Sequence, residues 1–156
     1  HTTINGPFTK DGNGLDMRLY IPVGEKWELS KSCIPTGDML VQTNHDRQYL
    51  TGSQVPVLHD IDNDVFFAEE GSLDGKPFYG AVATDAATGK RICYEVCKDF
   101  KFWVVWNDHG DKGYFCPEPC TWIIDAPNQP IPGEESGYRE LAPGESHTVT
   151  EKIYTA

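Results

Sequence analysis

Alternation of apolar and polar residues, the period of a β-strand, recurs along this chain of 156 residues. In residues 15–21 apolar side chains alternate with Asp and Arg, as in a half-buried strand. Comparable runs predict strands at residues 27–33, 65–69, 79–85, 91–96, 100–106, 113–116, 122–125 and 147–154. No segment combines helical periodicity with caps, so we predict an all-β chain.

Residues 102–106, Phe-Trp-Val-Val-Trp, are apolar on both faces of the expected strand. A strand sustains this pattern only when it is covered on both sides, which implies stacked sheets. We therefore predict an antiparallel β-sandwich or barrel. Thr88-Gly89 suits a hairpin turn, residues 35–37 (Pro-Thr-Gly) another turn, and the polar residues 44–64 long loops.

Composition narrows the possible partners. A mass of 17.4 kDa fits a single domain over residues 1–156. The net charge of −11 disfavours nucleic acid and anionic membranes, because binding either depends on clustered Lys and Arg. No apolar run approaches the roughly 18 residues that span a bilayer.

The five cysteines form an odd count, which favours a reducing compartment, and we predict a cytoplasmic protein unless a signal peptide has been removed. Cys93 and Cys97, and Cys116 and Cys120, are spaced more widely than the commonest zinc knuckles. No Gly-rich turn surrounds either pair, so we predict no metal site.

Glu118 is the strongest candidate for chemistry, because Pro117 and Pro119 flank it. The prolines fix the backbone on both sides and limit where the carboxylate points. Neighbouring apolar residues would raise its pKa toward that of a general base near neutral pH. The alternative is a surface carboxylate in a Pro-rich turn.

The chain resembles the C-terminal part of the aldose 1-epimerase family. That family ends with a Trp- and Val-rich strand, Glu-Pro-x-Thr, Ala-Pro-Asn and Leu-x-Pro-Gly-Glu before its last strand. Its central histidine stands in a His-x-x-Phe-Asn block, followed by a Pro-Thr-Gly turn. The matching segments here are residues 116–122, 126–128, 137–145, 1–5 and 34–37.

The resemblance implies a galactose mutarotase-like supersandwich, of which this chain is the C-terminal part. It implies that Glu118 is the general base and His1 the general acid. In that family an Asp binds the sugar hydroxyls. The resemblance assigns this role to Asp64, with the nearby Asp62 as the competing candidate. The other four histidines are expected at the surface or in loops: His45, His59, His109 and His147.

The implied reaction interconverts the α and β anomers of a free aldose without metal or organic cofactor. The implied partners are a monosaccharide and the N-terminal half of the fold, or a second polypeptide in its place, because that half supplies an Arg and a His to the family's pocket. Two alternatives stay open. One is a non-catalytic carbohydrate-binding or structural module. The other is a copper site built on His1 as a mature N-terminus.

Overall fold

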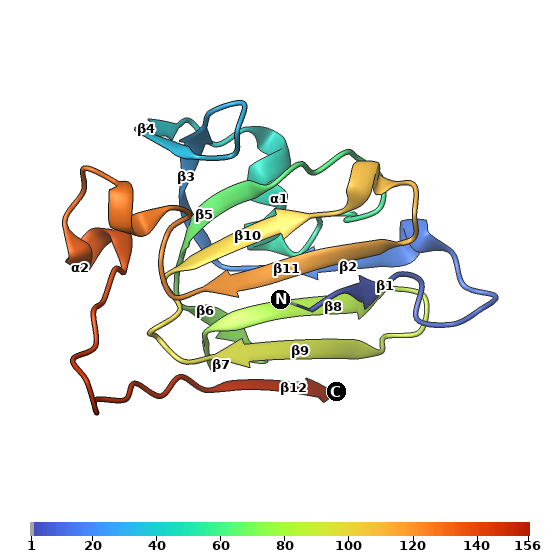
Figure 1. Ribbon diagram of the computed structural model, residues 1–156. Coiled ribbons are helices and arrows are strands. Elements are labelled where there is room, and N and C mark those ends of the chain that lie inside the picture. Colours follow the sequence, from blue (N-terminus) through green and yellow to red (C-terminus); the bar gives the residue numbers. More distant parts are fainter. Residues whose placement is uncertain (1) are drawn as a thin grey trace.

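Within residues 2–156, which the computed structural model describes, the strands form two antiparallel sheets that face each other (Figure 1). The large sheet has the order β1 (Ile4–Asn5), β11 (Tyr114–Cys120), β10 (Phe102–Trp106), β5 (Asp64–Ala68), β3 (Val23–Leu29) and β4 (Pro35–Leu40). The small sheet has the order β12 (Glu151–Thr155), β9 (Arg91–Val96), β8 (Gly80–Asp85) and β2 (Met17–Tyr20). A separate hairpin pairs β6 (Gly71–Leu73) with β7 (Lys76–Phe78). The fold is the antiparallel β-sandwich that the sequence predicted.

The main core fills the space between the two sheets. Trp103 and Phe66 of the large sheet pack in the same buried cluster as Leu19 and Ala83 of the small sheet. Every one of these side chains is essentially excluded from solvent. Burial of such apolar surface stabilises a fold by about 25 cal/mol per Å², so this layer is the main source of stability.

β10 is apolar on both faces because both faces are covered. Trp103 and Val105 point into the core between the sheets, whereas Phe102 and Val104 belong to a second cluster on the outer face of the large sheet. The segment after β11 covers part of that outer cluster and contributes Ile123. The prediction drawn from residues 102–106 is therefore confirmed.

Most predicted strands are present with small shifts at their ends. The hairpin predicted at Thr88-Gly89 joins β8 to β9, and Gly89 adopts a φ of 73°, which a glycine tolerates without strain. Residues 122–125, predicted as a strand, instead lead into the 3₁₀ turn η3 (Ala126–Asn128). The prediction of a turn at Pro-Thr-Gly was also wrong, because Pro35 begins β4. The turn lies just before this strand, where the Cys33 amide donates a hydrogen bond to the Ser30 carbonyl.

The prediction of loops throughout residues 44–64 was wrong, because α1 (Asn44–Thr51) occupies its first part. Thr43 accepts a hydrogen bond from the Asp46 amide, and the Asp46 carboxylate accepts one from the Thr43 amide in return. This reciprocal pair is a capping box, and Gly52 ends the helix in the left-handed conformation. The helix packs against β2.

The remaining helical turns are short: η1 (Gly14–Asp16), η2 (Asp108–Gly110) and α2 (Gly133–Ser136). None of the helices in residues 2–156 is long and apolar enough to cross a membrane.

Candidate functional site

Glu118 lies within β11, opposite Val104 of β10. The strand therefore continues beyond residue 116, where the sequence pattern ended it, and carries the Pro-Glu-Pro segment. Proline cannot donate to a strand ladder and is confined to edges. Among the described residues, β1 pairs only with Tyr114 and Phe115, so both prolines fall where that edge of β11 extends past β1.

The surroundings of Glu118 favour a carboxyl group that takes up a proton readily. Its side chain shares the outer face of the large sheet with Val104, since paired residues point to the same side. The residue is half-buried, and burial raises the pKa of its carboxyl above the usual 4.5. A raised pKa makes the carboxylate a stronger base than one in water.

Two thiols flank Glu118 on the same face, at Cys116 and Cys120. Burial raises the pKa of both, that of Cys120 to about 11, and the nearby Glu118 carboxylate adds to each shift. These thiols are therefore protonated near neutral pH. All five cysteines lie within the described residues, and each is a free thiol.

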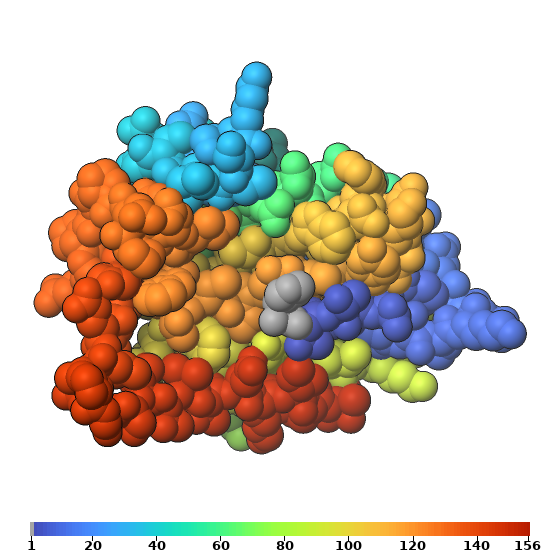
Figure 2. All heavy atoms as spheres, viewed as in Figure 1, coloured from blue at the N-terminus to red at the C-terminus, as the bar shows by residue number. Residues whose placement is uncertain are grey.

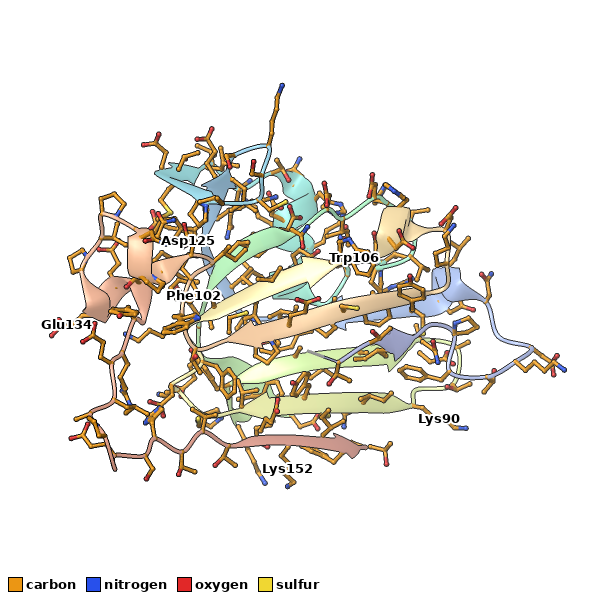
Figure 3. All side chains as sticks on the ribbon, in the orientation of Figure 1. Lys90, Phe102, Trp106, Asp125, Glu134 and Lys152 are labelled. Carbon is orange, nitrogen blue, oxygen red and sulfur yellow. The ribbon has the colours of Figure 1, made fainter. Side chains whose placement is uncertain are left out.

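An aromatic pair lies at one end of this face. Trp106, at the end of β10 in Figure 3, pairs with Cys116 across the ladder, and its ring lies 6.0 Å from that of Tyr114. The Tyr114 hydroxyl donates a hydrogen bond of 2.9 Å to Asp108. These two rings were not among the residues predicted from the sequence, although the period of two along β11 places Tyr114 on the same face as Glu118.

His1, the predicted general acid, lies outside the described residues. The residues that follow it run beside β11, because Ile4 pairs with Phe115. Thr3 Oγ1 lies 3.2 Å from Cys116 Sγ. The described start of the chain thus runs along the strand that carries Glu118.

Asp64 is not brought together with Glu118. It pairs with Val105, the neighbour of Val104, so its side chain leaves the opposite face of the large sheet. There Lys26 Nζ lies 2.7 Å from the Asp64 carboxylate. Asp62, the competing residue, is exposed and accepts a hydrogen bond from the Asn63 side chain.

Lys26 holds a second carboxylate, that of Asp46 in α1, at 2.9 Å. The Asp46 side chain is only 1% exposed. Burial acts to raise its pKa, but hydrogen bonds from Lys26 and Thr43 outweigh burial and leave the pKa below 3.8. This ion-pair cluster could not be predicted from the sequence because its members come from separate elements. The Thr43 and Asp46 spacing was the available signal for the helix.

A groove of about 1060 Å³ opens elsewhere, beside the edge strand β1. Most of its described lining residues come from the start of the chain, from β9 and from the end of β12, and they do not include Glu118. Ile4 and Tyr94 belong both to this lining and to the core between the sheets. One part of the groove therefore borders the core between the two sheets.

No group of three or more potential His, Cys, Asp or Glu metal ligands lies together in the described part of the chain.

Comparison with known proteins gives two consistent results. The family described as aldose 1-epimerase matches residues 1–154. The crystal structure of a galactose mutarotase-like protein from Clostridium acetobutylicum superimposes with a TM-score of 0.94 at 32% sequence identity. That match covers 100% of this chain and 46% of the other chain, so this chain spans about half the length of that protein.

Proposed function

Because the chain belongs to the aldose 1-epimerase family, we propose that it supplies the general base of an enzyme that interconverts the α and β anomers of a free aldose. The observation that carries this proposal is the half-buried Glu118, whose pKa is raised by burial on the outer face of the large sheet. A base with a pKa closer to the working pH transfers protons more effectively.

In the proposed reaction the Glu118 carboxylate removes the proton from the hydroxyl on carbon 1 of the sugar. His1, in its protonated form, donates a proton to the ring oxygen as the bond between carbon 1 and that oxygen breaks. The resulting aldehyde rotates about the bond between carbons 1 and 2. Ring closure from the other face returns both protons, so each group ends in its starting state.

The sugar-binding role of Asp64 stays a prediction. Its ion pair with Lys26 on the other face of the sheet gives the residue a structural role as well. The variant Asp64→Asn separates the two roles, because a sugar ligand would change KM whereas an ion-pair partner would change the free energy of unfolding.

We propose a monosaccharide and a second stretch of polypeptide as partners. The solved relative is more than twice as long as the region matched here, which supports a site completed by residues from outside this chain. That stretch either precedes these residues in one polypeptide or is a separate chain.

Polarimetry of freshly dissolved α-D-glucose and α-D-galactose tests the proposal, with this chain alone and within the longer protein. The variant Glu118→Gln keeps the shape of the side chain and removes the base. We expect its rate to fall by about 10²–10⁴-fold with sugar binding retained. The matched control is Glu95→Gln, an exposed glutamate of the small sheet. Full activity of Glu118→Gln would overturn the assignment.

A non-catalytic carbohydrate-binding module is the second candidate. It is favoured by the fact that the chain covers only 46% of its solved relative. Sugar binding without any acceleration of anomerisation, in the chain and in the longer protein alike, would select this candidate.

A further inference from the structure

A pocket of about 380 Å³ lies beyond the end of β11, on the side of the molecule where residues 121–147 pack (Figure 2). One wall comes from the segment after β11 and includes Trp122 and Tyr138. The lining also includes Asp99, Arg139 and His147. The volume falls near the lower end of the roughly 300–1,000 Å³ that small-molecule sites occupy.

Trp122 gives this pocket an aromatic wall that is held in place. Its ring stacks on that of Tyr138, with centroids 5.6 Å apart and planes inclined by 23°. The Trp122 side chain nevertheless remains 42% exposed. The Tyr138 hydroxyl donates a hydrogen bond of 2.7 Å to Glu140, which fixes the supporting ring. An indole that is backed by a second ring and still exposed offers a flat apolar surface to a ligand.

The backbone that carries the wall is closely packed. The Ile123 amide donates to the Ser136 carbonyl at 2.8 Å. Gly137 has a φ of 75°, and a Cβ at this position would lie 2.2 Å from the Thr121 carbonyl oxygen. The two segments of the wall therefore touch without room for a side chain, so the pocket is formed before any ligand arrives.

The polar rim carries charges of both signs. Asp99 lies 3.4 Å from His147 Nε2 and 3.8 Å from Arg139. The Lys101 ammonium donates to the Glu134 carbonyl, and Figure 3 shows Glu134 on the same side of the molecule. Together these groups provide both donors and acceptors to a ligand.

This combination decides the class of ligand. A multivalent anion would meet the Asp99 carboxylate in a chain of net charge −11. A cation would meet Lys101 and Arg139. A neutral polyhydroxylated ring uses donors and acceptors alike, and its C–H face removes apolar surface from water against Trp122.

We propose that this pocket is a second saccharide-binding site, separate from Glu118, that stacks a neutral hexose unit on Trp122. This pocket binds the sugar without reacting with it, because Glu118, to which the anomeric chemistry is assigned, is not among its lining residues.

Titration with methyl β-D-galactopyranoside and methyl β-D-glucopyranoside tests the proposal. These glycosides cannot anomerise, and binding is followed by saturation-transfer NMR and calorimetry. We expect Trp122→Ala to weaken the second site by about tenfold or more, and Glu118→Gln to leave it unchanged. Tyr138→Phe is the matched control, since it keeps the stacked ring and removes only the hydroxyl. Arg139→Gln tests the polar rim without changing the aromatic wall.

The outcomes are distinct from those for the anomerisation reaction. Binding that survives Glu118→Gln and is weakened in Trp122→Ala supports the second site, even if the unsubstituted protein does not accelerate anomerisation. Glycoside binding of unchanged affinity in Trp122→Ala overturns it, as does the absence of glycoside binding by the unsubstituted protein. The rate of glucose anomerisation should be unchanged in Trp122→Ala.

Discussion

Glu118 of β11 and Val104 of β10 are direct partners across the large sheet, and their side chains share its outer face. The neighbouring pair, Val105 and Asp64, points to the opposite face. The carboxylate assigned to catalysis and the one assigned to sugar binding are therefore separated by the sheet itself. Glu118 is therefore the centre of the proposed site, whereas Asp64 forms an ion pair with Lys26 on the opposite face.

The raised pKa of Glu118 predicts the acid limb of the activity profile. Since the base must be ionised, kcat/KM for anomerisation should rise with pH through a value above the usual 4.5. Polarimetry between pH 4 and pH 8 locates this limb. A limb at or below 4.5 would contradict the assignment of a half-buried base.

The same pKa predicts a difference in stability between wild type and Glu118→Gln. A carboxyl whose pKa is higher in the folded state favours folding when protonated, so wild type loses stability as pH rises from 4.5 to the folded value. The glutamine does not titrate. The free energy of unfolding of Glu118→Gln relative to wild type should therefore increase across that window, as urea titrations at several pH values would measure. An unchanged difference would argue against the burial of this carboxyl.

Lys26→Met should be strongly destabilising because it leaves Asp46 and Asp64 without their shared cation. Breaking a buried ion pair from one side costs about 3–5 kcal/mol, measurable by urea denaturation at pH 7. The control is Lys98→Met, whose partner Glu70 lies 2.8 Å away with side chains 72% and 47% exposed. Exposed pairs contribute about 0–1 kcal/mol. Equal effects of the two substitutions would refute the structural role of Lys26.

Asp46 adds a pH dependence to this cluster. Its pKa is lowered below 3.8 in the folded protein, so its ionised form stabilises the fold above that value. This contribution should disappear as pH falls through the folded pKa. Asp46→Asn should therefore destabilise the protein more at pH 7 than below the folded pKa of Asp46, as thermal unfolding at decreasing pH would measure. An equal effect across this range would contradict the prediction.

Gly137→Ala should destabilise the wall of the proposed saccharide pocket. Gly144→Ala is the matched control, because Gly144 has a φ of 88° but open space where a Cβ would stand. The control should cost about 1–2 kcal/mol for the left-handed backbone alone. Gly137→Ala adds the clash with the Thr121 carbonyl and should cost more. Equal losses in the two variants would show that the wall yields easily.

Much of this fold could be predicted because strand periodicity is local. Alternating residues gave the positions of β2, β5, β8 and β9, and the doubly apolar run at residues 102–106 required a second layer over the sheet. The helix α1 was missed because its signal was a capping box within a polar stretch. Its mean polarity resembled that of a loop, and its stability comes from packing against β2 and from Lys26.

By itself, the sequence determined an antiparallel β-sandwich or barrel and singled out Glu118, because a strand period and a carboxylate between two prolines are properties of neighbouring residues. Only the tertiary structure decided the register of β5 and β10, which turns Asp64 away from Glu118. It also brought Lys26 to Asp46 and Trp122 to Tyr138. Register and such contacts depend on pairing between distant segments, and a shift of one residue moves every side chain of a strand to the other face.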